Sequence, residues 1–480
     1  MLNTIPKNMF NLLYRRNSKN MTINGKINYI RHLYSHGLVH QQDEFYKQEL
    51  ERKNLKLPEL ERKQKTLLDL INKNRENSNF QLGQARQERR EVMTEKTDIK
   101  DTLTYHREIN HDLLNKISSE ITSQFSSKRN LEILLGTLSI AYETNPKNQA
   151  LRIKRNTESK PIYMSAISAL LIQNLIENNY KFNSKYVSEI IQKHEDNETP
   201  NSQEMFTEIQ KPLVKGIYLQ YLGHTSPSSK IMTETDSPPK ILTTQEREKL
   251  LKLSKNAGKI FFENAVDAIP PKFDTHQEKE EFEKGIESQL SFITSTITSL
   301  NNSKSEIGQL LKVCQVYTSF MLPDKPRVVE NSHIKAYDIM IQLAKDKKIN
   351  PIFTSRLLSM MGKFPLGTGL YFFDQDNKSI DKVIVTRTNP ENPNEPITKR
   401  TLKKFKKVNE SEELIISQKS NLYFKEIRRK FDINKTNFRV QFNEGDENLK
   451  FYWKPNESLK HGHIDEDKVW EKKQSRRRTV

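Results

Sequence analysis

Apolar residues spaced three or four positions apart are the feature that most restricts how this chain can fold. Between residues 99 and 121, leucines and isoleucines recur about every four positions and draw one stripe along a helix. Leu, Ile, Lys, Glu, Asn and Gln dominate the first 365 residues, a mixture that favours helices. Only 14 of the 480 residues are glycine, which disfavours β-sandwiches and glycine-rich phosphate loops. We therefore expect several helices in this part of the chain.

The sequence pattern changes after residue 366. Short runs rich in β-branched and aromatic residues are predicted to be strands, at Gly369–Phe373, Lys382–Thr386, Glu413–Ile416, Phe438–Phe442 and Leu449–Trp453. Turn-forming segments separate some of them, at Asp374–Lys378 and Glu444–Asn448. The basic segments in between are expected to be partly helical, at Thr401–Lys407 and Tyr423–Phe431. The predicted fold is mainly α, with an irregular array of helical hairpins and a small C-terminal α+β module on an antiparallel sheet.

Prolines and polar segments divide the chain into expected parts. Pro58 is expected to separate a first helical run from Glu59–Lys73, and Asn145–Ser159 is expected to be a basic loop. Thr243 to Glu246 fits a capping box at the start of a helix. The expected order is a presequence at 1–35, charged amphipathic helices at 43–125, a helical domain at 128–222, a linker at 223–243, a second helical domain at 244–363, the α+β module at 366–455 and a basic disordered tail at 456–480.

Two segments of the chain have similar patterns. Residues 172–189 and 341–358 each predict an apolar helix, a polar turn and a second helix. Helical hairpins of this form build pentatricopeptide-type arrays, but such arrays need tandem copies with a period of about 35 residues. Only two distant units occur here, so ordinary pairing of antiparallel helices is the favoured interpretation.

The N-terminal segment is basic and lacks acidic residues before Asp43. Apolar residues at helical spacing precede Arg15 and Arg16, which predicts a cationic amphipathic helix. Import receptors and the membrane potential of mitochondria select such a helix. Arg31 leads a segment that resembles sites cut by the matrix processing peptidase, so we expect the mature start within 32–36. Arg15, Arg16 and Arg31 are therefore the expected targeting residues, and the mitochondrial matrix is the expected location.

The net charge of the chain is +18, and the segment after residue 42 still carries +12. A polyanionic partner such as RNA, DNA or an anionic membrane surface explains such an excess. The alternative is that matrix proteins are often basic and that AT-rich genomes favour lysine. The expected partners are mitochondrial RNA, the mitochondrial ribosome, or both.

The strongest candidate for nucleic-acid contact is the C-terminal module, where basic and aromatic residues are interleaved. Phosphates require cations, and unstacked bases require flat apolar faces. Alternatively, the aromatic residues form the core of a small sheet and the basic run is a solvated face. The candidate residues are Lys399, Arg400, Lys403, Lys404, Lys406, Lys407, Tyr423, Phe424, Arg428, Arg429 and Lys430.

Other chemistry receives weaker support from the sequence. The single cysteine, Cys314, excludes an intramolecular disulfide, and its apolar surroundings indicate a core residue. Asp374 and Asp376, with Asp381 and Lys382, faintly resemble nuclease sites, but their place at a predicted turn indicates a structural role. His32, His36 and His40, and likewise His461, His463 and Asp465, lack the surroundings of a specific metal site. We predict no metal, no cofactor and no catalytic residue.

These observations favour a non-enzymatic factor of organellar gene expression that acts on RNA processing, transcript stability or translation. One alternative is a helical scaffold or assembly factor for a mitochondrial ribosome or a respiratory complex. It would use the amphipathic helices near 99–121, which could also form a short coiled coil. Another is an unrecognised nuclease or RNA-modifying enzyme. We expect no transmembrane segment, although peripheral contact with the inner membrane is compatible with the charge.

Overall fold

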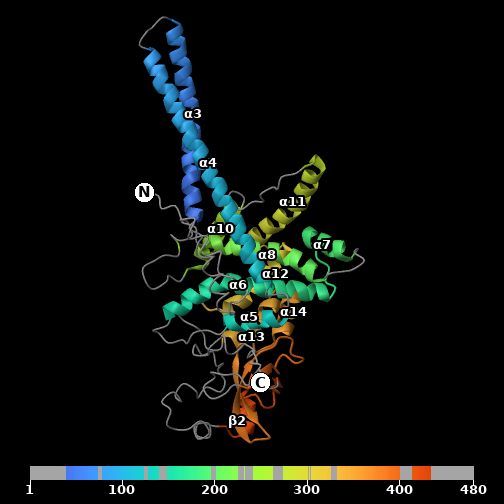
Figure 1. Ribbon diagram of the computed structural model, residues 1–480. Coiled ribbons are helices and arrows are strands. Elements are labelled where there is room, and N and C mark those ends of the chain that lie inside the picture. The colour runs from blue at the N-terminus through green and yellow to red at the C-terminus, as the bar shows by residue number, and fades with distance from the viewer. Residues whose placement is uncertain are drawn as a thin grey trace, which may run out of the picture. The chain divides into compact units, whose positions relative to one another are not determined.

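The computed structural model describes most of the chain between residues 39 and 433. The described residues are 39–73, 78–123, 128–139, 149–195, 202–224, 232, 242–262, 274–300, 302, 304–325, 332–400 and 413–433. Over these residues the protein is mainly helical, with a small antiparallel sheet close to its C-terminal end (Figure 1). The predicted fold class is thereby confirmed. None of the described helices is both long and apolar enough to cross a membrane.

The described residues fall into two compact units, and neither unit is continuous in the sequence. The first unit is built from Glu120–Val214 and Ser299–Val480, and the second from Leu33–Ser119 and Lys215–Thr298. The helices α4 and α8 each contribute to both units. The linear order of segments expected from the sequence remains a prediction.

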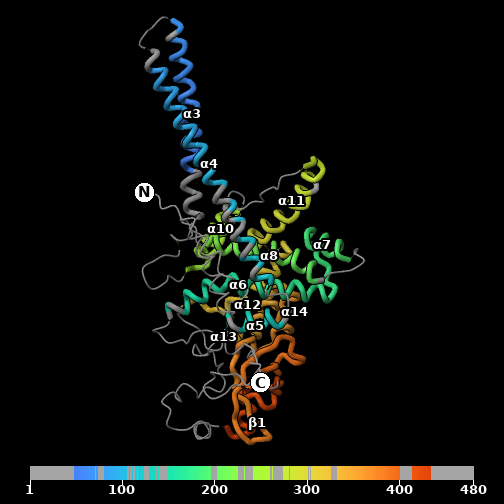
Figure 2. Tube along the Cα trace, viewed as in Figure 1, coloured from blue at the N-terminus to red at the C-terminus, as the bar shows by residue number. Residues whose placement is uncertain are grey.

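The second unit contains a hairpin of two long helices, α3 (Val39–Asn72) and α4 (Ser78–Ser123), which run side by side (Figures 1 and 2). Their inward positions alternate between spacings of three and four residues, which is the seam of an antiparallel coiled coil. On α3 these positions are Lys53, Leu57, Leu60, Gln64 and Leu67, and on α4 they are Leu82, Ala85, Arg89, Val92, Lys96, Ile99 and Leu103. The expected spacing of four residues is found between Ile99 and Leu103 and between Ile117 and Ile121, but the buried Leu114 lies three residues before Ile117, so the spacing along α4 is mixed.

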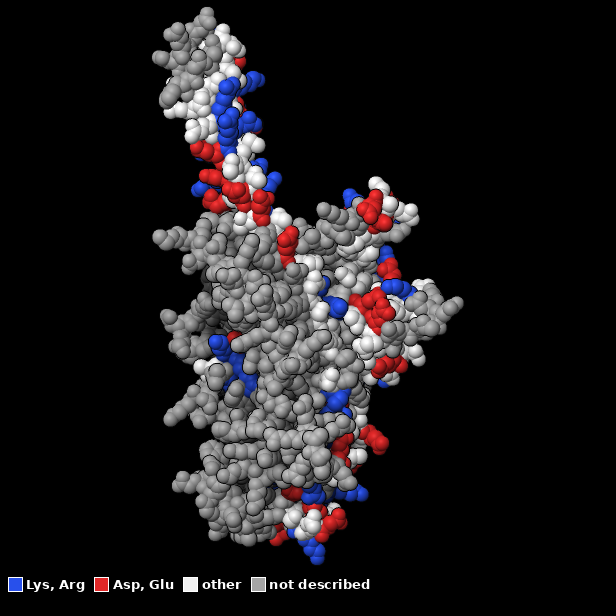
Figure 3. Space-filling view, viewed as in Figure 1, with Lys and Arg blue, Asp and Glu red and all other residues white. Residues whose placement is uncertain are grey.

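Charged side chains join the two helices of this hairpin. Lys56 pairs with Glu88 at 3.1 Å, Arg89 pairs with Glu61 at 2.8 Å, and Lys53 pairs with Glu95. The hydrogen bond and charge of Lys56 lower the pKa of the Glu88 carboxyl. Figure 3 shows both acidic and basic residues on the visible surface of the hairpin.

The prediction that Pro58 interrupts the first helix is wrong, because α3 continues through it. Pro58 is exposed on the side away from the seam. Water can therefore solvate the carbonyl group that loses its partner, and packing of the seam on both sides of Pro58 keeps the helix continuous.

Three further helices meet in the second unit: the C-terminal half of α8 (Ser202–Gly223), α10 (Thr244–Phe261) and α11 (His276–Thr298). The predicted capping box at the start of α10 is confirmed. Glu246 N–H donates to Thr243 Oγ1 at 3.3 Å, and Thr243 N–H donates to Glu246 Oε2 at 2.8 Å. The reciprocal bonds satisfy two N–H groups that would otherwise lack partners at the helix end.

The helices of the first unit are α5 to α7 together with α12 to α14. Their bounds are Lys128–Ser139, Gln149–Glu177 and Lys185–Glu195 for the first three, and Glu306–Met321, Ser332–Lys345 and Pro351–Met361 for the others. The predicted pairs of helices at 172–189 and 341–358 are present, as α6 with α7 and α13 with α14. The chain is also non-helical at Asn302 and Pro323, on either side of α12.

The expected basic loop at 145–159 is wrong from Gln149 onward, because α6 begins there. Arg152, Asn156 and Lys160 lie four residues apart and share one helix face. Arg152 donates to Pro323 O and Lys325 O at 2.9 and 2.8 Å, Asn156 donates to Pro323 O at 2.8 Å, and Lys160 pairs with Asp324 at 2.5 Å. These polar side chains bind residues 323–325, which follow α12, instead of facing water.

The C-terminal sheet is a meander of four strands in the order β1-β2-β3-β4, all antiparallel. The strands are Gly369–Asp374, Ser379–Val385, Ile397–Arg400 and Leu414–Ile415, and the helix α15 follows at Lys425–Lys430. The chain after β4 returns to the free edge of β1, where Phe373 N–H donates to Ser420 O and Leu422 N–H donates to Tyr371 O. This contact curls the sheet around a core that includes Phe364, Leu370 and Val383.

The strands expected from the sequence near 369, 382 and 413 are confirmed, and so are the turn at 374–378 and a short helix within 423–431. Strand β3 was not predicted, because its four residues are mostly polar. The strands predicted at 438–442 and 449–453 and the turn predicted at 444–448 lie outside the described residues, as does most of the predicted linker.

Candidate functional site

The predicted nucleic-acid-binding residues that the structure describes fall into three groups. Lys399 and Arg400 end β3, Tyr423 and Phe424 lie in the segment that returns to β1, and Arg428, Arg429 and Lys430 form the last turn of α15. Lys403, Lys404, Lys406 and Lys407 lie outside the described residues, between β3 and β4. The three targeting arginines, Arg15, Arg16 and Arg31, also lie outside them.

Arg400 is bound to other residues of the C-terminal module. Its guanidinium donates to Asp381 Oδ2 at 2.6 Å and to Asp374 Oδ2 at 2.8 Å. It also lies 5.4 Å from the ring centroid of Phe372, a distance at which a cation is attracted to an aromatic face. Arg400 therefore crosslinks three strands of the sheet, since β2 carries Asp381 and β1 carries Asp374 and Phe372.

Asp374 closes the turn between β1 and β2. Its Oδ1 accepts the N–H groups of Asp376 and Asn377 at 3.1 and 3.3 Å, and its Oδ2 accepts the Asn377 side-chain amide at 2.8 Å. Hydrogen bonds from Arg400 and Asn377 lower the pKa of Asp374 to about 2. Asp374 therefore has the structural role expected for it, and two of the three acidic groups that resembled a nuclease site, Asp374 and Asp381, are bonded to Arg400.

The low pKa of Asp374 predicts a dependence of stability on pH. Because the folded pKa, about 2, is below the ordinary value of 3.8, the ionised group stabilises the fold above pH 3.8. This stabilisation is lost as the pH falls from about 4 to about 2. Asp374→Asn should cost about 1–2 kcal/mol at pH 7, because charged hydrogen bonds are lost.

The measurement is urea unfolding of both proteins across this pH range. The difference between the urea midpoints of the parent chain and of Asp374→Asn should shrink toward pH 2. A gap that is constant with pH would contradict the assignment. Asp376→Asn is the matched control, because no side-chain contact of Asp376 is found in the described structure and its variant should unfold like the parent chain.

The aromatic candidates contribute to packing. Tyr423 and Phe424 are half-buried against the core of the sheet, and their ring centroids lie 5.3 and 6.0 Å from that of Phe364 in edge-to-face geometry. Burial raises the pKa of the Tyr423 hydroxyl. Arg428 donates to the carbonyls of Leu422 and Tyr423 at 2.6 and 2.9 Å, which holds α15 against this segment.

Four other cations of the module have no carboxylate partner among the described residues. Within the described residues, Lys399, Lys425, Arg429 and Lys430 have no ion pair, and the last three are exposed. By contrast, four carboxylates of the module are held internally: Asp374 and Asp381 by Arg400, Glu413 by Arg387, and Glu395 by the hydroxyl of Ser417 and the N–H of Gln418. Asp376, Glu391, Glu426 and Asp432 are also exposed, so the described surface carries both signs of charge, and its cations are concentrated on α15.

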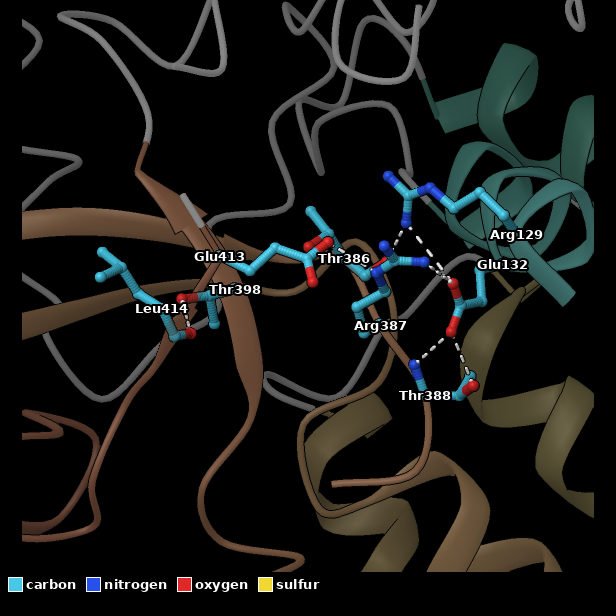
Figure 4. A network of polar contacts seen from close by, with 8 residues as sticks. All are labelled: Arg129, Glu132, Thr386, Arg387, Thr388, Thr398, Glu413 and Leu414. Carbon is cyan, nitrogen blue, oxygen red and sulfur yellow. Dashed lines mark hydrogen bonds and ion pairs between the residues drawn. The ribbon is translucent and has the colours of Figure 1, made fainter. Parts of the chain in front are cut away.

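A buried polar network fixes the other end of the sheet to α5 (Figure 4). The Glu132 carboxylate is 2% exposed and accepts both the N–H and the hydroxyl of Thr388 at 2.8 Å. Arg387 and Arg129 approach its other oxygen at 3.2 and 3.5 Å. Arg129 also donates to Thr386 O at 2.7 Å, and Arg387 donates to Glu413 at 2.6 Å.

Desolvation and the neighbouring Arg387 lower the pKa of Arg129. This network was not predicted, because its two halves are about 250 residues apart in the chain.

Other candidate chemistry finds little support in the described structure. Among its residues, no three His, Cys, Asp or Glu side chains are placed to hold a metal ion. Cys314 is fully buried, and burial raises the pKa of its thiol to about 12. That thiol is therefore protonated at neutral pH, as a core residue would be. The histidines near residues 32–40 and 461–463 lie outside the residues whose side chains are described.

Comparisons of this chain with protein-family models, curated proteins and solved structures found no match. The structure alone therefore defines the class of protein: a mainly helical chain with a small curled antiparallel sheet near the C-terminal end of its described residues.

Proposed function

We propose that this chain is a non-enzymatic factor of organellar gene expression that acts in the mitochondrial matrix. It binds RNA or the mitochondrial ribosome through the basic surface of its C-terminal module. The observation that carries the proposal is the charge distribution in that module: Arg387 and Arg400 pair with acids, while Lys425, Arg429 and Lys430 are exposed and have no ion pair among the described residues.

The basic run between β3 and β4 strengthens this proposal. Four lysines follow Arg400 within seven residues, Lys403, Lys404, Lys406 and Lys407. Both ends of the segment that contains them are anchored, at Arg400 by two aspartates and at Glu413 by Arg387. A rigid sheet that carries a cationic segment is suited to electrostatic capture of phosphates. The half-buried Tyr423 and Phe424 support the sheet, so electrostatics rather than stacking on these two rings is the expected mechanism.

Charge reversal tests the proposal. Replacing Lys403, Lys404, Lys406 and Lys407 by glutamate should weaken binding of a labelled uridine oligonucleotide by about tenfold or more and flatten its salt dependence. The matched control reverses four exposed cations of the coiled-coil hairpin: Lys65, Lys73, Arg86 and Lys100. Both variants have the same net charge, so only the position of the charge differs.

The cellular form of the experiment uses isolated mitochondria. The full chain should be recovered from the matrix fraction, crosslinked to RNA or sedimenting with ribosomes, and nuclease should release it. Failure to recover RNA above background, together with no binding of the oligonucleotide, would contradict direct RNA binding.

The hairpin of α3 and α4 favours a second candidate, a scaffold or assembly factor for a mitochondrial ribosome or a respiratory complex. Its balanced charges suit a protein surface better than a phosphate backbone. This candidate predicts a stable protein partner that remains bound after nuclease treatment. Deletion of the hairpin should release that partner.

A further inference from the structure

In each of the two helical hairpins of the first unit, α6–α7 and α13–α14, the first helix ends in the same kind of turn. After α6, Asn179 has φ 57° and the N–H of Tyr180 donates to Leu175 O, five residues earlier. After α13, Lys347 has φ 55° and the N–H of Lys348 donates to Leu343 O, again five residues earlier. Both are Schellman turns with a left-handed residue in the same place. The similarity of residues 172–189 to 341–358 thus extends to the backbone.

The first turn of α12 clamps both hairpins. Glu306 Oε2 accepts the N–H groups of Asn183 and Ser184 at 2.9 and 3.2 Å, and Glu306 Oε1 accepts the Tyr180 hydroxyl at 3.0 Å. One helical turn further on, Gln309 Oε1 accepts the side-chain amide of Asn350 at 2.6 Å, and Asn350 caps α14. A single helix therefore fixes the start of the second helix in each hairpin.

Direct contacts hold the two turns together. The rings of Tyr180 and Phe353 meet edge to face, with centroids 5.5 Å apart. Arg356 donates to the side-chain oxygen of Asn178 at 3.2 Å. The turn after α6, the turn after α13 and the segment before α12 consequently form one continuous end of the first unit.

This end is rich in exposed cations. We call the hairpin-turn patch the set of Lys181, Lys185, Lys304, Lys347, Lys348 and Arg356, all of which are exposed. The nearby acids are weak competitors: Lys185–Glu189 and Lys348–Asp346 are separated by 3.7 and 3.8 Å at exposed positions, where ion pairs contribute little. Glu306 is occupied by the backbone of α7. Lys181, Lys304 and Lys347 have no ion pair in the described part of the chain.

We propose that the hairpin-turn patch is a second surface for the phosphate backbone of RNA, separate from the basic run of the C-terminal module. The proposal rests on the proposed function for its choice of ligand. Hydrogen bonds to Glu306 and Gln309 fix the backbone that carries these cations. Their positive charges are therefore held in a fixed arrangement that phosphates can bind. Their presence on three segments that meet only in the folded chain explains why no basic run marks this surface in the sequence.

Two charge-reversal variants of the full chain test the proposal with a fluorescent uridine oligonucleotide. The patch variant replaces Lys181, Lys304, Lys347 and Lys348 by glutamate, and the control variant replaces Lys65, Lys73, Arg86 and Lys100. The patch variant should bind at least about tenfold more weakly, and its log–log salt slope should fall by about 3, or about 0.7 for each lost contact. The control should bind like the parent chain, and unchanged far-UV circular dichroism shows that both fold.

Crosslinking distinguishes failure of the second RNA surface from failure of the proposed function. Photocrosslinked nucleotides should map to peptides around 178–185 and 345–356. If they map only near residues 399–430 and the patch variant binds normally, the second surface is wrong while the proposed function stands. If the parent chain binds no oligonucleotide even at low salt, both fail. If the parent chain instead binds cardiolipin-containing vesicles and the patch variant does not, the surface serves a membrane and the proposal is overturned.

Discussion

Replacing Glu132 by alanine is expected to destabilise the first unit by about 3–5 kcal/mol, the cost of breaking a buried charge network. The carboxylate satisfies the buried N–H and hydroxyl of Thr388 and faces the guanidiniums of Arg129 and Arg387. Without it, the buried polar groups of Thr388 lose their partner, and Arg129 and Arg387 lose the carboxylate that lies between them. Chemical unfolding followed by circular dichroism gives the change in free energy.

Two further variants show whether the buried bonds carry this effect. Glu132→Gln keeps an acceptor for Thr388 but removes the charge, so its loss should be intermediate. Glu413→Ala removes the exposed partner of Arg387, a side chain that is 34% exposed, and should cost less than about 1 kcal/mol. Equal losses in Glu132→Ala and Glu413→Ala would show that burial of the network has no energetic importance.

Gly223→Ala is the second substitution with a large expected effect. A Cβ atom at Gly223 would overlap the carbonyl oxygen of Ser254, and one at Gly258 would lie 2.6 Å from Leu219 O. Because the obstructing atoms belong to the backbone, α8 and α10 would have to move apart. The bond between Ser254 and His224, now 2.9 Å, would be strained as well. We expect Gly223→Ala to lower the free energy of unfolding by about 2–3 kcal/mol.

Gly285→Ala in α11 is the matched control. A Cβ there meets no atom within 4 Å, so the substitution should gain the helix propensity of alanine, about 1 kcal/mol. Opposite signs for the two substitutions, measured by thermal or urea unfolding, would establish close helix packing at Gly223. A gain in stability for both would contradict it.

The candidate nucleic-acid site was only partly readable from the sequence. The density of lysines around residues 399–407 identified a cationic segment, because that property needs no partner. The roles of Arg400, Tyr423 and Arg428 depend on neighbours that the sequence does not reveal: Arg400 binds two aspartates, Tyr423 packs on Phe364, and Arg428 binds two backbone carbonyls. The hairpin-turn patch had no signal, since its cations come from three separate segments.

Local patterns in the sequence were sufficient for the mainly α fold, the capping box at Thr243, the two helical hairpins and the strands near residues 369 and 382. Each of these depends on periodicity or on bonds between residues a few positions apart. Tertiary structure alone decided that α3 continues through Pro58, that Arg152 serves the end of α12, and that Glu132 joins α5 to the sheet. Burial and pairing of these residues are set by partners far away in the chain, and such partners leave no trace in local spacing. The same reason explains why only the folded chain distinguishes Arg400, which pairs with two aspartates, from the exposed cations Lys425, Arg429 and Lys430.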